Sequence, residues 1–510
     1  MEPPRVHITA YGCQMNQLDA EVLAQRLRDA GATVVADPAA ADVLLFVTCA
    51  VREHAENRVF SNIGALGPRK RRQPGLVIGL LGCMAQQYGE AVRRRAPLVD
   101  IVCAPGRLAE LPALIDAARA ARPAVALDPP RGPAGGPAAF AALDAALDAA
   151  EAARPLGGPS PGHAYVAVMR GCDNFCAYCV VPHVRGPERS RPPAAVLDEV
   201  RRLAAQGARQ ITFLGQAVNQ YAAREAGRAW DLADLLAATA AAAPGLARLG
   251  FITSHPRAMT PRLARVFGDV PRVVPYLHMP AQSGADAVLA RMNRGYTAAE
   301  YADRVALVRA ARPEVAVASD FIVGFPGETA ADLEATLGLV RQVRFSAAFV
   351  FKYSPRPGTA AAGWSDDVPA AEKARRHKAL LDLVHEIAAE ENRRLVGRRV
   401  AVFVEGPSPR PNLDAAHRLS RGGCESPRGG SPPGATGGII GRGGSPHPPR
   451  TNQAAARPGW VQLRGRTPCN RIAVFDGPPD LAGSEVEVTV TDASPLTLFA
   501  SLPPDVPGLV

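Results

Sequence analysis

The feature of this sequence with the clearest chemical meaning is a group of three cysteines, Cys172, Cys176 and Cys179, spaced C-x3-C-x2-C. Thiols clustered this closely usually bind metal, although buried structural cysteines are the alternative. Zinc would need a fourth ligand, and His183 lies near enough in the sequence to be one. Three thiolates also suit a cubane iron–sulfur cluster that keeps one iron open.

Three further cysteines each follow a short apolar run in the first part of the chain. The runs occupy residues 6–10, 43–47 and 76–81. They end at Cys13, Cys49 and Cys83, and each is followed by a helical pattern, so the segment is predicted to be a parallel α/β sheet. Ligands bind at the carboxyl edge of such sheets, where helix N-termini also favour thiolates. We therefore expect these three cysteines to converge as a second ligand set, the alternative being small core residues.

The other cysteines of the nine, Cys103, Cys424 and Cys469, lack this placement and are predicted not to be ligands. The sequence begins Met-Glu-Pro-Pro-Arg, without the apolar segment of a secretory signal. We therefore expect a cytoplasmic protein whose thiols stay reduced and available to metals.

Composition excludes several classes of protein without choosing an activity. The 510 residues are 47% hydrophobic, which argues against global disorder. No apolar run approaches the ~20 residues of a membrane span, so a membrane protein is not expected. The 58 Lys and Arg residues exceed the 48 Asp and Glu residues, giving a net charge of +10 that is compatible with a nucleic-acid partner.

The pattern of apolar runs and turns divides the chain into three predicted domains and a linker. The boundaries are 1–121 for the N-terminal α/β domain, 122–157 for an Ala-, Pro- and Gly-rich linker, 158–396 for the central domain and 397–506 for a small C-terminal β-barrel. A short helix is possible at 138–153. Residues 407–458, dense in Gly, Pro, Ser and Arg, are predicted to be a low-complexity insertion.

The central domain alternates strands and helices and is predicted to be a partial or full (βα) barrel, whose site lies at the carboxyl ends of its strands. The expected strands are 164–169, 210–214, 248–253, 273–278, 315–323 and 346–353. Gln216, Asn219 and Gln282 stand at these strand ends, where they could contact a ligand or cap loops. The cysteine triplet follows the first strand, as an open catalytic cluster would require.

These motifs together resemble the methylthiotransferase family of radical S-adenosylmethionine (SAM) enzymes, and within it the type that acts on dimethylallyladenosine in tRNA. The resemblance rests on the C-x3-C-x2-C loop and on the spacing of the three earlier cysteines. It also rests on Tyr11-Gly12-Cys13-Gln14-Met15-Asn16, Cys179-Val180-Val181-Pro182 with Arg185-Gly186, Met292-Asn293-Arg294-Gly295-Tyr296-Thr297, and Gly465-Arg466-Thr467 of a TRAM-like barrel. The usual Gly-Gln-Asn-Val-Asn of the family is here Gly-Gln-Ala-Val-Asn, with Ala217 in the middle.

The resemblance implies a tRNA-modifying transferase with two [4Fe-4S] clusters. Cys13, Cys49 and Cys83 would hold the first cluster; Cys172, Cys176 and Cys179 would hold the second, which binds and cleaves SAM. Gln216, Asn219 and Gln282 would contact SAM or the adenine, and Arg464, Arg466 and Arg471 would contact RNA. The implied reaction is methylthiolation of carbon 2 of N6-isopentenyladenosine at position 37 of tRNA, by radical chemistry.

The implied partners are the tRNA anticodon loop, an electron donor such as flavodoxin or ferredoxin, and a sulfur donor, with no membrane. One alternative keeps the chemistry but changes the substrate to N6-threonylcarbamoyladenosine or a ribosomal protein. Another is a non-catalytic iron–sulfur or zinc protein that binds RNA, which the intact cysteine triplet and the full set of barrel strands disfavour.

Overall fold

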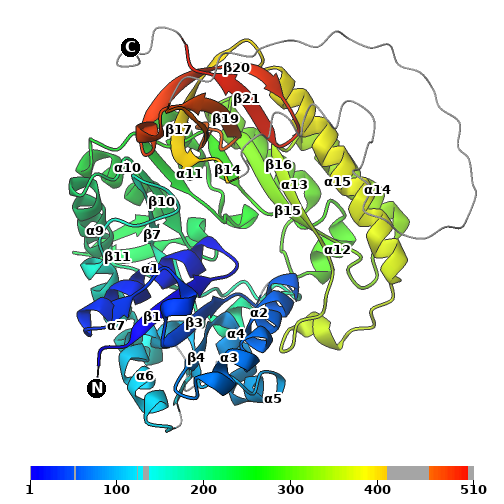
Figure 1. The fold of residues 1–510 in the computed structure, drawn as a ribbon. Helices are drawn as coiled ribbons and strands as arrows, with labels where there is room; N and C mark the ends of the chain where they lie inside the picture. The colour runs from blue at the N-terminus through cyan, green and yellow to red at the C-terminus, as the bar shows by residue number, and fades with distance from the viewer. Residues whose placement is uncertain (1, 51–52, 123, 130–136, 410–458, 504–510) are drawn as a thin grey trace, which may run out of the picture.

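A computed structural model describes the chain except for residues 1, 51–52, 123, 130–136, 410–458 and 504–510. The N-terminal α/β region lies along one side of the central barrel, and a small C-terminal barrel covers the opposite end (Figure 1). Among the described residues, none of the helices combines the length and the hydropathy of a membrane-spanning segment.

The N-terminal region is a six-stranded parallel sheet with the strand order β2-β1-β3-β4-β5-β6. Its strands are β1 (Arg5–Ala10), β2 (Thr33–Val34), β3 (Val43–Thr48), β4 (Val77–Gly82), β5 (Ile101–Cys103) and β6 (Ala124–Ala126). Its helices are α1 (Gln14–Asp29), α2 (Glu53–Ala65), α3 (Gly67–Arg72), α4 (Cys83–Tyr88), α5 (Val92–Arg95) and α6 (Leu111–Arg119). The three predicted strands are confirmed as β1, β3 and β4, whereas β2, β5 and β6 are short edge or flanking strands that the apolar runs did not indicate.

The segment interpreted from composition as a linker contributes structure to both neighbouring regions. Its first residues form β6 of the sheet, and α7 (Ala141–Ala153) occupies most of the stretch where a short helix was possible. Helix α7 presents Asp144, Asp148 and Glu151 on one face, because these positions are about one helical turn apart. These carboxylates pair with arginines at the start of the barrel, and Arg189 Nε lies 2.6 Å from Asp144 Oδ2.

The central domain is an open barrel made of two three-stranded parallel sheets, ordered β13-β10-β7 and β14-β15-β16. These strands are β7 (His163–Ala167), β10 (Gln210–Leu214), β13 (Arg248–Phe251), β14 (Tyr276–His278), β15 (Ala316–Val323) and β16 (Ala347–Lys352). The two sheets meet at an isolated parallel bridge between Leu249 and Val273. All six predicted strands are thus confirmed, but β14 is shorter than expected because Pro275 has no N–H to donate to a ladder.

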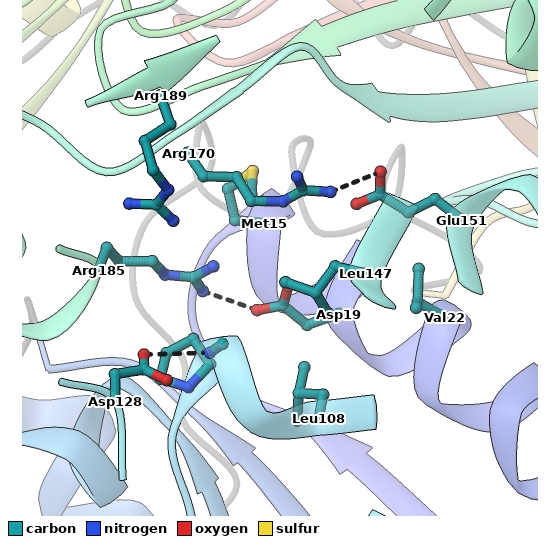
Figure 2. A pocket seen from close by; sticks show the side chains of 12 residues that line it. Met15, Asp19, Val22, Leu108, Asp128, Leu147, Glu151, Arg170, Arg185 and Arg189 are labelled. Carbon is teal, nitrogen blue, oxygen red and sulfur yellow. Dashed lines mark hydrogen bonds and ion pairs between the residues drawn. The ribbon is translucent and has the colours of Figure 1, made fainter. Parts of the chain in front are cut away.

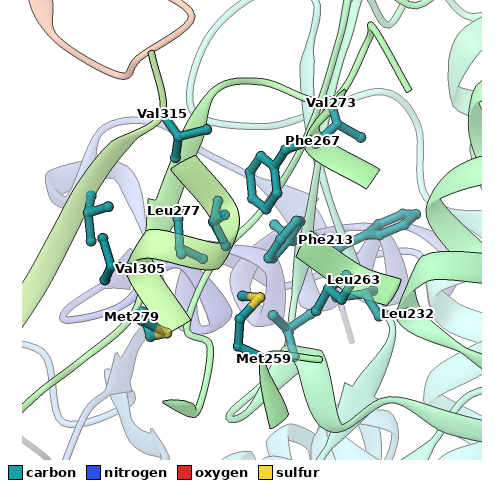
Figure 3. Packing of buried hydrophobic residues seen from close by; sticks show 14 of the residues in the cluster. Phe213, Leu232, Met259, Leu263, Phe267, Val273, Leu277, Met279, Val305 and Val315 are labelled. Carbon is teal, nitrogen blue, oxygen red and sulfur yellow. The ribbon is translucent and has the colours of Figure 1, made fainter. Parts of the chain in front are cut away.

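Helices surround the central strands and bury one large apolar core, in which Phe213, Leu277 and Met279 interdigitate (Figure 3). The helices are α8 (Val181–Val184), α9 (Pro193–Ala205), α10 (Leu232–Ala242), α11 (Pro261–Asp269), α12 (Asp286–Arg291), α13 (Ala298–Ala311), α14 (Ala330–Val343) and α15 (Ala370–Arg393). Two short ribbons add β8 (Met169–Arg170) with β9 (Arg189–Ser190), and β11 (Ala222–Glu225) with β12 (Arg228–Asp231). This packing leaves the carboxyl ends of the strands facing the N-terminal region.

The C-terminal region is a closed barrel with the strand order β17-β18-β19-β21-β20. Its strands are β17 (Arg399–Pro407), β18 (Val461–Arg466), β19 (Ile472–Gly477), β20 (Glu485–Ala493) and β21 (Thr497–Ser501). Four strands match predicted β-like runs, and β21 closes the barrel by pairing with both β19 and β20. The predicted insertion at 407–458 lies almost entirely outside the described residues.

The C-terminal barrel docks on the amino ends of the central strands. Arg248, the first residue of β13, pairs with Glu485 at 2.5 Å, and the rings of His163 and Phe403 lie 6.5 Å apart. The carboxyl ends of the central strands, with the candidate site, are therefore at the other end of the central barrel.

Candidate iron–sulfur and SAM site

The three N-terminal cysteines come together at the carboxyl edge of the sheet, as predicted. Cys13 caps α1, Cys49 follows β3 and Cys83 begins α4 after β4. A hydrogen bond with Cys49 lowers the pKa of the Cys13 thiol to about 6, and the charge of Cys13 contributes to the raised pKa of Cys83. The three sulfurs therefore interact across 70 residues of sequence, and both Cys49 and Cys83 are buried.

The second triplet lies on the loop between β8 and α8. Cys172 and Cys176 are buried, and each accepts a hydrogen bond from a polar neighbour. Asn174 Nδ2 donates to Cys172 Sγ at 3.2 Å, and Arg294 Nη1 donates to Cys176 Sγ at 3.1 Å. Burial and the two neighbouring thiols raise the pKa of Cys179 to about 12. A thiol in this setting ionises readily only when a cation compensates its charge, as a bound metal does.

The donor set of each triplet is three thiols, which suits an iron–sulfur cluster that keeps one iron open. Within the part of the chain that the structure describes, no three His, Cys, Asp or Glu side chains are arranged to hold one metal ion. His183, the sequence candidate for a fourth zinc ligand, has its ring edge-on to that of Phe175. In a cubane each of the three cysteines binds a different iron, so the sulfurs of a triplet need not meet at one point.

A cavity of about 710 Å³ opens beside the second triplet, within the size range of small-molecule sites. Cys179 lines it, together with Tyr178 from the same loop. Its other walls come from β15 with Asp320, from β16 and the loop after it with Phe351 and Tyr353, from the segment after β14 with Gln282, and from the first turn of α15 with Lys373. The cavity thus combines aromatic walls with a few polar groups.

The predicted ligand-contacting residues separate into two kinds of environment. The Asn219 amide is fully used by the backbone of His255: it donates to the carbonyl at 2.9 Å and accepts from the N–H at 2.7 Å. Gln282, in the segment after β14, lines the cavity and has a φ of +72°. Gln216 Oε1 is buried and, among the described residues, has no hydrogen-bond partner.

Two further buried polar atoms near Gln216 share this condition. Ser254 Oγ and His255 Nδ1 also lack a hydrogen-bond partner within the described part of the chain. Burial lowers the pKa of His255 to about 3, so its imidazole is neutral at physiological pH. Unpaired buried polar atoms are costly, and these three gather at the carboxyl ends of β10 and β13, the end of such a barrel where ligands bind.

The three arginines predicted to contact RNA already have partners, two within the C-terminal barrel and one on α15. Arg464 and Arg466 share the carboxylate of Glu405, at 2.7 and 2.9 Å. Arg471 Nε donates to Asn392 Oδ1 of α15 at 2.8 Å. Arg464 and Arg466 still expose about a third of their side chains, 34% and 36%.

Sequence reasoning did not single out two arginines that touch the cysteine sulfurs. Arg185 Nε donates to Cys83 Sγ at 3.3 Å, and Arg294 contacts Cys176 as described above. Arg185 lies in the Arg185-Gly186 motif and Arg294 in the motif of residues 292–297. Their position inside these family motifs was the signal that could have identified them. A buried cation beside a thiol favours the thiolate, which is the form that binds metal.

Gly12 provides a selective way to disturb the first triplet. Its φ is +109°, and a Cβ at this position would lie 2.3 Å from Cys49 Cβ. We expect Gly12→Ala to displace Cys49 and to remove about half of the iron of the reconstituted protein, because only one of two cubanes is affected. Iron and sulfide analysis would measure this, with Gly31→Ala as the control. Gly31 has φ +84° and no described atom within 4 Å of the added methyl, so an equal loss there would contradict the argument.

Two family models match parts of the chain. Residues 5–104 match the model of the uncharacterized protein family UPF0004, and residues 166–340 match the radical SAM superfamily. A solved radical SAM methyltransferase, TsrM from Kitasatospora setae, aligns with a TM-score of 0.51 over 70% of this chain and 75% of its own. Because the sequence identity is only 16%, this similarity supports a shared fold and nothing further.

Curated relatives match almost the whole chain. The tRNA-2-methylthio-N(6)-dimethylallyladenosine synthase of Rhodopirellula baltica is 40% identical over 97% of this chain and 94% of its own length. The proteins of the same name from Chromobacterium violaceum and Acidithiobacillus ferrooxidans are 39% and 40% identical, each over 97% of this chain. With two cysteine triplets at the carboxyl edges of an α/β sheet and a radical SAM barrel, this chain belongs to the tRNA-2-methylthio-N(6)-dimethylallyladenosine synthase family.

Proposed function

We propose that this protein transfers a methylthio group to carbon 2 of N6-isopentenyladenosine at position 37 of tRNA, giving 2-methylthio-N6-isopentenyladenosine. The observation that carries the proposal is the presence of two cysteine triplets in one chain, each with two buried cysteines and with an arginine contact to a sulfur. The second triplet, outside the barrel, would give the chain a cluster separate from the one that cleaves SAM, and we propose that the transferred sulfur is held there. The names of the relatives supply the nucleoside.

In this proposal Cys13, Cys49 and Cys83 hold one [4Fe-4S] cluster, and the loop triplet holds the other. When bound, the loop cluster supplies the electron that cleaves SAM, and no side chain can do this. Arg294 holds Cys176 in place, with its Nη2 also donating to the Pro280 carbonyl at 3.0 Å. The loop is thereby tied to the far side of the barrel.

The cavity beside Cys179 is the proposed place for the adenine. Tyr178, Phe351 and Tyr353 give it aromatic walls, and stacking of a base on such a wall contributes about 1–3 kcal/mol. The unpaired atoms of Gln216, Ser254 and His255 are proposed to bind SAM through its polar groups. Carbon 2 of adenine is neither acidic nor nucleophilic, so a neutral His255 suits a role in binding rather than in proton abstraction.

The reaction needs partners that the chain does not itself supply. We propose that an electron donor such as flavodoxin or ferredoxin reduces the clusters and that a separate sulfur donor replenishes the transferred sulfur. The tRNA is bound through its anticodon loop, where an unpaired base can be splayed out. A cytoplasmic location follows from this substrate.

Arg464, Arg466 and Arg471 are proposed to contact tRNA phosphates from the C-terminal barrel. For Arg464 this requires that its ion pair with Glu405 break when RNA binds, while the ion pair between Arg466 and Glu405 remains. We expect Arg464→Ala to weaken tRNA binding and to reduce the slope of log Kd against log salt by about 0.7. Binding titrations at several salt concentrations would measure the slope. Arg201→Ala on α9 is the control, and an equal change there would contradict a specific contact.

The proposed function is tested by anaerobic reconstitution with iron and sulfide, followed by dithionite, SAM and tRNA bearing N6-isopentenyladenosine. We expect mass spectrometry to find both 5′-deoxyadenosine and 2-methylthio-N6-isopentenyladenosine. Absence of 5′-deoxyadenosine would exclude the radical reaction. If 5′-deoxyadenosine formed and the tRNA stayed unmodified, tRNA with N6-threonylcarbamoyladenosine and ribosomal protein would be tried as the substrate.

A further inference from the structure

Arg185 connects the barrel to the cysteine triplet of the other domain. It follows α8, six residues beyond Cys179, and therefore belongs to the segment that leaves the SAM-binding loop. Its guanidinium nevertheless points into the N-terminal region, where Nε donates to Cys83 Sγ at 3.3 Å. Both ends of this contact are buried, Cys83 at 5% and Arg185 at 8% exposure.

The rest of the guanidinium is held by α1, the helix that Cys13 caps. Arg185 Nη2 donates to Asn16 Oδ1 at 3.0 Å and to Asp19 Oδ2 at 2.7 Å. Asn16 in turn donates to the Tyr11 carbonyl at 2.6 Å, immediately before Gly12 and Cys13. One side chain from the barrel thus reaches Cys83 directly and the Cys13 turn through Asn16.

The charges around Arg185 indicate that it faces more than one anion. Figure 2 shows it between Asp19 and Asp128 in a small polar pocket, with Arg189 and Arg170 on the barrel side. The negative charges of Asp19, Cys83 and Cys13 all raise its pKa. Different N–H groups of the guanidinium face Asp19 and Cys83, so its positive charge lies against the thiol as well as against the carboxylate.

We propose that Arg185 is a positioning residue that completes the N-terminal cluster site from the barrel. It fixes the positions of Cys83 and of the Cys13 turn relative to each other. Its positive charge stabilises the reduced cluster, which carries one more negative charge than the oxidised cluster. Arg294 makes the equivalent contact with Cys176, but its described partners all belong to the barrel. Arg185 therefore makes the first cluster depend on how the two domains are docked. This inference rests on the proposed cluster assignment.

The experiment uses the full chain with Cys172, Cys176 and Cys179 changed to alanine, so that only the N-terminal cluster can form. Arg185→Gln, Arg185→Lys and the control Arg189→Gln are compared in this background. Arg189 lines the same pocket and pairs with Asp144, and among the described contacts it has none with a cysteine. Iron content, resistance to a chelator and a redox titration followed by electron paramagnetic resonance are measured, and circular dichroism checks folding.

We expect Arg185→Gln either to lose iron or to keep a cluster that is harder to reduce. At the midpoint potential of the background protein, the ratio of oxidised to reduced cluster should rise about tenfold, which is 59 mV for a one-electron couple. Arg185→Lys keeps the charge but cannot reach Cys83, Asn16 and Asp19 together. Its cluster should therefore have a reduction potential closer to that of the background protein than the cluster of Arg185→Gln has. It should still release iron to the chelator faster than the background protein does. Arg189→Gln should match the background in every measurement.

The proposal is overturned if Arg185→Gln loads iron with unchanged potential and chelator resistance, or if Arg189→Gln changes them equally. Should Arg185→Gln fail to fold, Arg185→Lys decides, because behaviour identical to the background would exclude any dependence on the guanidinium. If the background protein itself binds no iron, the cluster assignment has failed instead. That result is separate from any effect of the arginine.

Discussion

Cys176→Ala is expected to abolish SAM cleavage and to remove about half of the iron, whereas Cys49→Ala should remove a similar share of iron and leave SAM cleavage intact. The difference follows from position. Cys176 lies on the loop beside the large cavity, and Cys49 lies at the sheet edge of the N-terminal region. A cubane held by two cysteines instead of three is not expected to persist. The methylthio product should be lost in both variants.

The measurements are iron and sulfide content, 5′-deoxyadenosine formation with SAM and dithionite, and analysis of tRNA nucleosides. Cys103→Ala is the matched control, because Cys103 is a fully buried thiol at the end of β5 that contacts neither triplet in the described residues. It should keep both iron and product. Full iron in Cys49→Ala would show that the N-terminal cysteines are not ligands, and loss of 5′-deoxyadenosine in that variant would show that the two sites are not separable.

Arg154→Met is expected to cause the largest loss of stability among the charged residues at the domain junction. The Arg154 side chain is 1% exposed and pairs with Glu199 at 2.9 Å and with Glu21 at 3.2 Å. It also donates to the Tyr165 carbonyl in β7. Removing one partner of a buried pair leaves uncompensated carboxylates and typically costs about 3–5 kcal/mol. Because Arg191 still pairs with Glu199 at 2.8 Å, we expect the free energy of unfolding to fall by about 3 kcal/mol, the lower end of this range.

Urea denaturation would measure the change in the free energy of unfolding, from the transition in which the central barrel unfolds. The control is Arg201→Met on α9, whose pair with Asp198 is exposed by 53% and 73%. Exposed pairs contribute at most about 1 kcal/mol, so this variant should unfold near the wild-type midpoint. A loss below 1 kcal/mol in Arg154→Met would mean that the carboxylates find other partners or take up protons.

The barrel strands could be predicted because a parallel strand covered on both faces requires a continuous apolar run. The predicted range 210–214 coincides with β10, and the cysteines at the ends of β1, β3 and β4 were placed by the same rule. The strands β5 and β6 were not predicted, because three residues are too few to form a recognisable apolar run. Their place in the sheet depends on pairing with neighbouring strands, which the local sequence does not specify.

The charged contacts at the junction could not be predicted, because their partners are far apart in the sequence. Arg185 and Cys83 are separated by 102 positions, and no local pattern pairs them. The acidic face of α7 was visible as helical spacing, but its alanine-rich surroundings favoured a linker. The pairing of Arg464 and Arg466 with Glu405 likewise needed the antiparallel register of β17 and β18, which brings Glu405 and these arginines together.

The register of β17 and β18 has a consequence for how members of this family can differ in length. Pro407 lies opposite Leu463, and the Ser408 N–H donates to the Gln462 carbonyl at 2.8 Å. The two ends of the intervening segment are therefore held one strand spacing apart by the barrel itself, whatever connects them. Each doubling of that segment's length costs only about 0.6 kcal/mol of closure entropy, so the stability of the barrel constrains its length weakly. The position is one where evolution, or a protein engineer, can add sequence without altering the strands on either side.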